Sequence, residues 1–148
     1  MAENGSVKTA RKLVPLRPGM FRMPGAVGDP VHLLAVRCRS CGETFFPKRV
    51  FCANCSGGDM EDVELPDRGE IQTFTIVRQQ LPGSAMEPPY AIVRVAVEGG
   101  VSVQTVIPAC ESVRIGTPVE FIAGRIMDDE AGDTVVSFIA RPLAGKPG

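Results

Sequence analysis

Short apolar segments separated by turn residues dominate the chain from residue 69 onward. Residues 90–98 place valines at alternate positions, Gly99 and Gly100 follow, and residues 101–107 alternate again, a pattern that predicts a β-hairpin. β-Branched residues over 69–77 predict an earlier strand, with a bulge near Thr73 where the alternation breaks. Residues 118–123 and 134–140 predict two more strands, which gives five in all.

Five short strands with a break after the third are typical of the oligonucleotide/oligosaccharide-binding (OB) barrel. Residues 108–117 are expected to form that break, and residues 127–133 an acidic turn. A different five-stranded Greek-key barrel would give nearly the same pattern, so the pattern leaves that alternative open.

The first thirty residues lack such periodicity. Four prolines and several glycines in residues 1–30 predict an extended N-terminal arm rather than a helix. Residues 81–89 form a long connection, suited to partner or ligand contacts but equally compatible with a plain surface loop. We therefore expect a mainly β chain divided into an arm (1–30), a small module (31–60), a barrel (61–143) and a tail (144–148).

The small module carries four of the five cysteines, in two Cys-x-x-Cys pairs. The pairs are Cys38 with Cys41 and Cys52 with Cys55, and ten residues lie between them. Two such turns brought together by a hairpin place four thiolates around one Zn²⁺, with Zn–S distances near 2.3 Å. All four ligands come from the protein, so this zinc is expected to fold a rubredoxin-like zinc ribbon and to do no Lewis-acid chemistry.

Three other interpretations of the cysteines are possible in principle. Disulfides need an oxidising compartment, and residues 1–6 lack the apolar segment of a signal peptide. A thioredoxin-like redox site needs one Cys-x-x-Cys motif rather than two in register. Iron in place of zinc stays open, because rubredoxin-type sites also use four cysteines. Phe45, Phe46, Val50 and Phe51 are expected to form the small core of the ribbon, with Pro47 turning its hairpin.

Length and charge exclude several classes of protein. A chain of 148 residues is too short for the large two-halved α/β folds, and none of its apolar runs approaches the roughly 20 residues of a membrane span. A cytoplasmic protein without a membrane segment is therefore expected. Residues 1–57 carry nine basic and three acidic residues, whereas residues 58–148 carry seven and fourteen. The asymmetry indicates two surfaces with different partners, or simply solvated faces of different sign.

The chain resembles the acyl-CoA-associated zinc-ribbon/OB-fold family called DUF35. The resemblance covers about residues 36–142. It rests on the two cysteine pairs, Phe46-Pro47, the Thr73-Phe74-Thr75 strand and the Pro88-Pro89-Tyr90 strand entry, in this order. Many family members have an amphipathic helix before the ribbon. Here Met20–Pro30 replaces it, so we expect an arm that extends over a partner instead.

The resemblance implies a non-catalytic accessory subunit of a thiolase-fold enzyme in a hetero-oligomer. Family members sit beside thiolase-like enzymes that process acyl-CoA thioesters, including aromatic ones, by thiolytic or retro-Claisen C–C cleavage. There the partner holds the nucleophile, and the small subunit stabilises it and helps to bind or gate the CoA substrate.

Catalysis by the chain alone is not expected. His32 is the only histidine and adjoins Leu33 and Leu34, as a packed or surface residue does. Cys110 is the unpaired cysteine, and it lacks the companion histidine and oxyanion hole of a thiolase nucleophile in its neighbourhood.

Basic residues surround the cysteine pairs, and among them Arg37, Lys48 and Arg49 are the predicted contacts to the phosphates of CoA. The alternative is that these cations only offset the −2 charge of a zinc tetrathiolate.

Two other functions compete with that of an accessory subunit that handles substrate. A single-stranded nucleic-acid module is disfavoured by 5% aromatic residues, the absence of Trp and an acidic barrel half. A purely structural scaffold subunit stays open.

Overall fold

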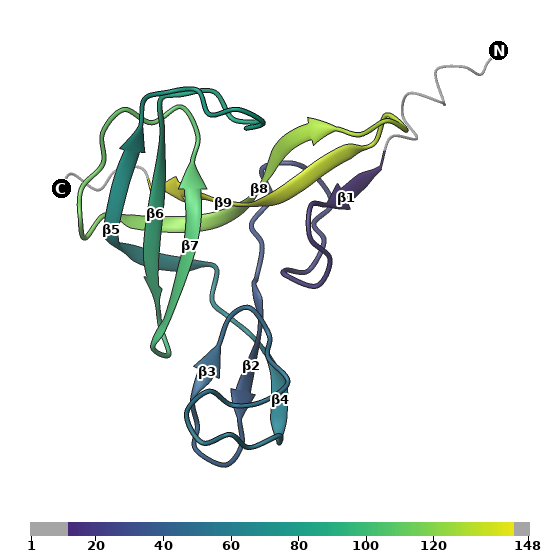
Figure 1. Ribbon diagram of the computed structural model, residues 1–148, viewed down its shortest axis with the longest axis vertical. Coiled ribbons are helices and arrows are strands. Elements are labelled where there is room, and N and C mark those ends of the chain that lie inside the picture. The colour runs from purple at the N-terminus through teal and green to yellow at the C-terminus, as the bar shows by residue number, and fades with distance from the viewer. Residues whose placement is uncertain (1–11, 144–148) are drawn as a thin grey trace.

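The structure is a computed structural model that describes residues 12–143, and in that part the regular elements are all strands (Figure 1). They form a three-stranded sheet in the order β3-β2-β4 and a six-stranded sheet in the order β1-β9-β8-β5-β6-β7. The small sheet lies below the large one in Figure 1, as a separate lobe. The strands are β1 (Leu13–Pro15), β2 (Leu34–Cys38), β3 (Thr44–Phe45), β4 (Met60–Glu64), β5 (Arg68–Val77), β6 (Tyr90–Val97), β7 (Val101–Ile107), β8 (Pro118–Asp128) and β9 (Thr134–Pro142).

The large sheet confirms the OB barrel. β5 pairs along its length with β6 and, through its first three residues, with β8. β6–β7 and β8–β9 are antiparallel hairpins, and β7 lies beside β9. The Thr105 hydroxyl donates a hydrogen bond to the Phe138 carbonyl at 2.9 Å, which joins these two strands in the buried interior. Gly99 and Gly100 have positive φ values and form the β6–β7 turn.

The predicted strands match the observed ones, with differences at their ends. A register shift between Ile71 and Thr73 in β5 confirms the bulge. β8 is longer than predicted and continues to Asp128, so the acidic turn is shorter. In that turn the Asp129 carboxylate accepts hydrogen bonds from the amides of Ala131 and Asp133, both at 2.9 Å. This local capping lets the two strands extend towards the turn.

Alternation of apolar residues creates the barrel core. The inward positions of β6 and β7 are buried, and Phe121 and Val119 from β8 are fully covered. Leu33 and Val31 also enter this cluster, although they precede the ribbon in the chain. The segment that enters the ribbon is therefore anchored in the barrel.

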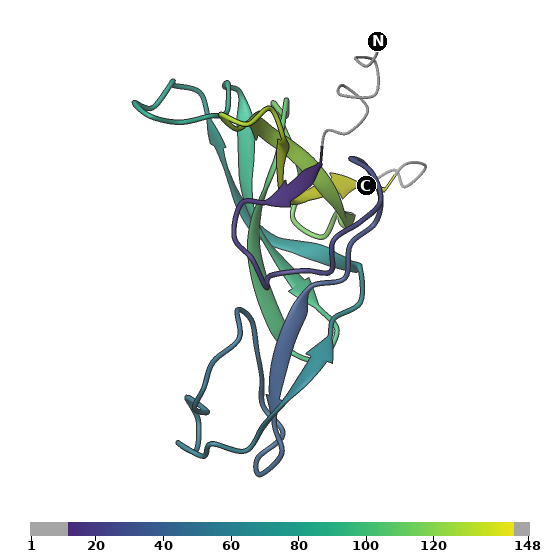
Figure 2. The ribbon, with the colours of Figure 1, turned by 90° about the vertical axis from the view of Figure 1, so that its right-hand side faces the viewer.

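The described part of the N-terminal arm lies on this chain's own barrel. β1 pairs in parallel with β9 at residues 134–136. Further along, the amides of Gly28 and Val31 donate to the carbonyls of Ala123 and Phe121 in β8, at 2.8 and 3.0 Å. Figure 2 shows the purple β1 against the yellow β9. For residues 12–30 the expectation of an arm extended over a partner is replaced by this pairing, because β8 and β9 offer backbone groups that the arm satisfies. Residues 1–11 lie outside the described part.

The small sheet is built around β2. β3 pairs with its second half, and β4 pairs with all of it, from Leu34 with Glu64 to Cys38 with Met60. The ribbon sheet thus extends across the predicted division between residues 60 and 61. The Leu65 amide donates to the Leu33 carbonyl at 2.9 Å, which ties the exit from the ribbon to its entrance.

The expected small core of the ribbon is wrong, because two of its four residues are exposed and a third packs against the barrel. The Val50 and Phe51 side chains are 76% and 63% exposed. Phe45 and Phe46 are half-buried, and the Phe46 ring packs edge-on against Phe138 of the barrel. Because the cysteine pairs fix both ends of the intervening segment, that segment does not need an apolar core to hold its shape.

Within residues 12–143 there is no helix with the length and apolar character to cross a bilayer.

Candidate metal centre and its surroundings

Four cysteine sulfurs converge at the tip of the ribbon. The Sγ atoms of Cys38, Cys41, Cys52 and Cys55 all lie within 4.8 Å of one another. The Cys38–Cys55 and Cys41–Cys52 sulfur pairs are 3.6 and 3.5 Å apart. A tetrahedral Zn²⁺ with 2.3 Å bonds requires sulfurs about 3.8 Å apart. The structure thus brings the four predicted ligands together, in a cage that fits a tetrahedral ion with a small adjustment.

The two cysteine turns have the same backbone form. The Gly42 amide donates to the Cys38 carbonyl at 2.8 Å, and the Ser56 amide donates to the Cys52 carbonyl at 2.9 Å. Gly42 and Ser56 both have positive φ values, +85° and +65°. This left-handed conformation follows each pair directly and turns the second sulfur back towards the first. Gly and Ser, small residues, thus stand where the chain curls most tightly.

Backbone amides point at the sulfurs and stabilise their ionised form. The amides of Asn54 and Cys55 lie 3.3 and 3.4 Å from the Cys52 sulfur. The Cys41 amide lowers the pKa of the Cys38 thiol, and the Asn54 side chain lowers the pKa of Cys41 to about 6. Hydrogen bonds to a thiolate favour the charged form, which is the form that binds zinc.

Cys55 behaves in the opposite way. The Gly57 amide lowers the pKa of Cys55, but the neighbouring Cys38 and Cys52 thiols outweigh it, and the pKa rises to about 12. Sulfurs packed this closely resist the last ionisation unless a cation is present. The donor set, four thiolates with no nearby carboxylate or histidine ligand in the cluster, suits Zn²⁺ in a closed structural site. Zn²⁺ bound here would have no open position for water or substrate.

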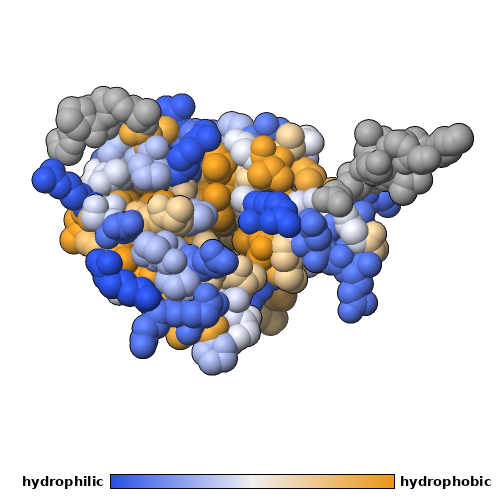
Figure 3. All heavy atoms as spheres, turned by 90° about the horizontal axis from the view of Figure 1, so that it is seen from above, coloured by the Kyte–Doolittle hydropathy of each residue, from blue (hydrophilic) through white to orange (hydrophobic). Residues whose placement is uncertain are grey.

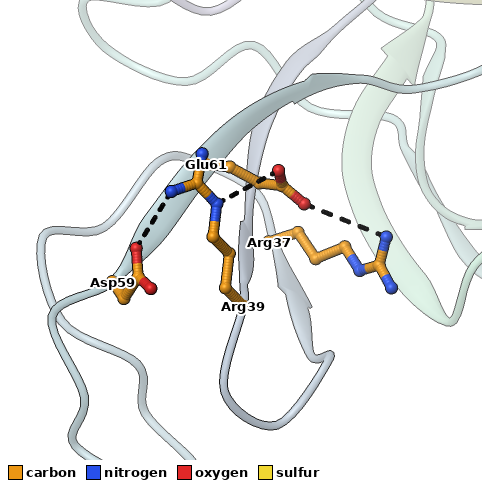
Figure 4. A network of polar contacts seen from close by, with 4 residues as sticks. All are labelled: Arg37, Arg39, Asp59 and Glu61. Atoms are coloured by element: carbon orange, nitrogen blue, oxygen red, sulfur yellow. Dashed lines mark hydrogen bonds and ion pairs between the residues drawn. The ribbon is translucent and has the colours of Figure 1, made fainter.

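The basic residues around the cage are mostly paired with β4. Arg39 reaches Asp59 at 3.2 Å and Glu61 at 3.3 Å, and the second oxygen of Glu61 lies 3.9 Å from Arg37 (Figure 4). Lys48 lies 3.4 Å from the Asp62 carboxylate. Every side chain in these pairs is about one-third exposed or more, so the ion pairs contribute little to stability.

This pairing changes the meaning of the charge asymmetry. The division at residue 57 separates the cations near the cysteines from the acidic β4, yet β4 folds directly onto β2. Residues 31–65 together carry four basic and five acidic side chains. The ribbon is therefore a lobe of nearly balanced charge rather than a basic one.

Arg49 differs from its neighbours. No carboxylate lies within ion-pair distance of it among residues 12–143. Its guanidinium carbon is 5.7 Å from the centre of the Phe45 ring, and its Nε donates to the Phe51 carbonyl at 3.3 Å. Of the three cations predicted to contact CoA, Arg49 is the one whose charge is left available.

His32 and Cys110 lie away from each other in the fold. His32 is exposed at the entrance to the ribbon, with its Nδ1 3.1 Å from the Leu65 carbonyl. Cys110 is buried in the barrel core, and its thiol donates to the Ser112 carbonyl at 3.4 Å. Neither residue takes part in a cluster of nucleophile and base.

Residues 85–89 of the long connection, together with Pro108 and Ala109, line a cleft of about 400 Å³ at the end of the barrel. Seen from this end, apolar side chains gather across the middle of the face, with polar ones around them (Figure 3). The cleft is completed by Arg125, Ile126 and Ile139, which come from β8 and β9. These three residues carry no local sequence signal, because only the barrel topology brings them beside the loop.

The fold and the sulfur cage together define a zinc-ribbon/OB-fold protein. Residues 30–61 match the rubredoxin-like zinc ribbon domain of ChsH2, and residues 62–125 match the C-terminal OB-fold domain of ChsH2. A DUF35 domain-containing scaffold protein of Methanocaldococcus jannaschii is 31% identical over 109 residues, which are 72% of this chain and 77% of that protein. The chain belongs to the DUF35 family, and the resemblance stated from its sequence is confirmed.

Two further relatives have informative names. The benzoylsuccinyl-CoA thiolase subunit BbsA of Thauera aromatica is 27% identical over 128 residues, which are 85% of this chain and 86% of BbsA. The solved structure of the Ltp2-ChsH2(DUF35) aldolase contains a chain that is 25% identical, with a TM-score of 0.59. That match covers 75% of this chain and 84% of the matched chain.

Proposed function

We propose that this protein is a non-catalytic, zinc-containing accessory subunit of a thiolase-fold enzyme acting on acyl-CoA thioesters. The observation that carries the proposal is the closed cage of four sulfurs in a chain of this family. A metal held by four protein ligands stabilises a lobe but cannot activate water or a carbonyl. Without another nucleophile–base cluster among residues 12–143, the bond-making falls to a partner.

The names of the relatives support the type of partner. BbsA is a subunit of a thiolase, and the similar ChsH2 chain was solved together with Ltp2 as an aldolase. Thiolytic and other retro-Claisen cleavages break the Cα–Cβ bond of a β-oxoacyl thioester, after a nucleophile has attacked the β-carbonyl carbon. The reaction proposed for the complex is a cleavage of this kind, with an acyl-CoA as the substrate. In a narrower form of the proposal, the acyl group is aromatic. A cytoplasmic location stays a prediction.

We further propose that the subunit helps to bind or gate the CoA part of the substrate through Arg37, Lys48 and Arg49. The available guanidinium of Arg49 supports this role. Arg37 and Lys48 are exposed and loosely paired, so phosphate could compete with Glu61 and Asp62 for them. The same pairing favours the second candidate, a scaffold subunit that touches no substrate, and the names of the archaeal relatives support that candidate too.

The partner is tested by purification of the tagged full chain from its native host and identification of co-purifying proteins by mass spectrometry. We expect a thiolase-fold protein in a defined ratio. Thioester cleavage is then assayed with each component alone and with both together, and activity is expected only when the partner is present. Recovery of this chain alone, or turnover by this chain in isolation, would overturn the proposal.

The CoA contact is tested separately, on the assembled complex. The double variant Lys48→Ala with Arg49→Ala is compared with the wild type by isothermal titration with CoA. Arg141→Ala is the matched control, because Arg141 is an exposed barrel arginine paired with Glu120. A loss of affinity confined to the double variant, in a complex whose subunit ratio by gel filtration is unchanged, supports substrate handling. An unchanged affinity favours the scaffold alternative and leaves the accessory-subunit proposal intact.

A further inference from the structure

The ribbon exposes two adjacent large apolar side chains. Val50, at 76%, is the most exposed large apolar residue in residues 12–143, and Phe51 is 63% exposed. The other exposed apolar residues of this part are isolated along the chain: Leu16, Met23, Val27, Phe74, Leu81, Ile115 and Met127. Single exposed apolar residues are ordinary on protein surfaces, whereas an adjacent valine and phenylalanine require a reason.

These two side chains sit on a rigid support. Phe51 immediately precedes the metal ligand Cys52, whose amide donates to the Gly57 carbonyl at 2.8 Å. One part of the Phe51 ring rests on Gly58, where an added Cβ would lie 3.4 Å from a ring carbon. Arg49 holds the Phe51 carbonyl from the other side. These contacts restrain the segment next to the cysteine cage, and a restrained segment loses less entropy on binding.

Arg49 places one unbalanced positive charge beside the pair, whereas Lys48 is balanced by Asp62. Lys48 and Arg49 precede Val50 directly, and Arg49 has no carboxylate partner in the described part of the chain. Phe and Arg are enriched in protein interfaces, and Arg is also enriched among the residues that dominate binding energy. An exposed apolar pair beside an available guanidinium therefore has the composition of an interface anchor.

We propose that residues 48–51, the ribbon tip, dock into an apolar pocket with a carboxylate rim on the thiolase-fold subunit. This inference rests on the proposed function and adds the surface through which the subunit acts. Val50 and Phe51 fill the pocket, and Arg49 pairs with the carboxylate at its edge. The metal cage behind the tip fixes the direction in which these side chains point.

The test uses the full chain and the purified thiolase-fold subunit identified by mass spectrometry. The double variant Val50→Ser with Phe51→Ser is compared with Ile115→Ser, a control of 68% exposure in the β7–β8 connection. We expect the affinity for the partner to fall about tenfold or more in the tip variant and to stay within about twofold in the control. Arg49→Glu is expected to weaken binding through repulsion by the rim carboxylate.

A second measurement guards against a tip variant that loses its metal. Zinc content is determined for each variant, and p-benzoylphenylalanine is introduced in place of Val50 for photo-crosslinking to the partner. A crosslink from this position and none from position 115 supports the proposal. Wild-type affinity in the tip variant, or crosslinks to a second copy of this chain only, overturns it while the accessory function stands. The absence of any thiolase-fold partner overturns both proposals.

Discussion

The Phe46 ring of the ribbon lies edge-on against the Phe138 ring of β9, with ring centres 5.6 Å apart and planes inclined by 81°. Phe138 also receives Phe21 from the N-terminal arm and Phe121 from β8, at 6.2 and 6.3 Å. One side chain of the barrel thus contacts three parts of the chain that are distant in sequence. Because edge-to-face aromatic pairs stabilise beyond simple burial, Phe138 helps to fix the ribbon relative to the barrel.

Phe46→Ala is expected to loosen this junction. Loss of the ring contact and of its partial burial should lower the free energy of unfolding by about 1–3 kcal/mol. Phe51→Ala serves as the control, because its ring is mostly exposed and its loss should cost about 0.5 kcal/mol or less. Urea denaturation of the zinc-loaded proteins measures both. Equal destabilisation of the two variants would contradict the assigned packing.

Gly69→Ala is expected to destabilise the barrel where β5 bends. A Cβ at this position would lie 2.5 Å from the Ala96 carbonyl oxygen and 2.6 Å from a Val95 methyl, so the backbone of β6 would have to move. We expect a loss of about 2 kcal/mol or more. Gly25→Ala is the control, because a Cβ at this position would lie 3.6 Å from its nearest neighbour, an ordinary contact distance. This substitution should change the free energy of unfolding by about 0.5 kcal/mol or less. A tolerated Gly69→Ala would contradict this close approach.

Cys52→Ser is expected to remove the bound metal and unfold the ribbon. Three thiolates remain, and the lost ligand is a buried one that accepts two amide hydrogen bonds. Cys110→Ser, the control, should retain one zinc per chain, since Cys110 lies in the barrel core away from the cage. Metal analysis of the purified proteins distinguishes zinc from iron at the same time. Zinc retained by Cys52→Ser, or absent from the wild type, would refute the assigned site.

Zinc affinity is expected to rise with pH. The metal-free Cys55 thiol, with a pKa of about 12, is protonated at neutral pH and must release its proton when zinc binds. The logarithm of the affinity should therefore increase by at least about one per pH unit between pH 6 and 9. Below pH 6 the dependence should steepen, because Cys41, with a pKa of about 6, becomes protonated as well. Competition titration with a chelator at several pH values measures the slope, and a flat profile would contradict it.

Local patterns were sufficient for much of the fold. The cysteine turns depend on residues within one motif, and the β6–β7 hairpin depends on alternation around Gly99 and Gly100. Strand positions in the barrel followed from the same alternation. The form of each cysteine turn was therefore predictable, since the hydrogen bonds that shape it lie within a few residues of each pair.

The remaining features depend on contacts between distant residues. The ribbon is less basic than its cysteine segment suggested, because Arg37 lies next to Glu61 in the fold, across the β2–β4 pairing. Phe46 packs against the barrel rather than within the ribbon, because the Phe138 ring of the last strand contacts it. Val50 and Phe51 have the composition of a core segment, and only the fold reveals that residues 12–143 leave them mostly exposed. Composition cannot distinguish a residue that packs inside from one that packs on another protein.

The short parallel pairing of β1 with β9 has a consequence for solubility. Beyond residues 134–136, β9 turns towards β7, so β1 covers the portion of the β9 edge that the barrel does not enclose. A chain shortened past Pro15 would present unpaired amides and carbonyls there, a template for strand addition by other molecules. We therefore expect the N-terminal arm to reduce aggregation by covering this edge, in addition to its hydrogen bonds with β8.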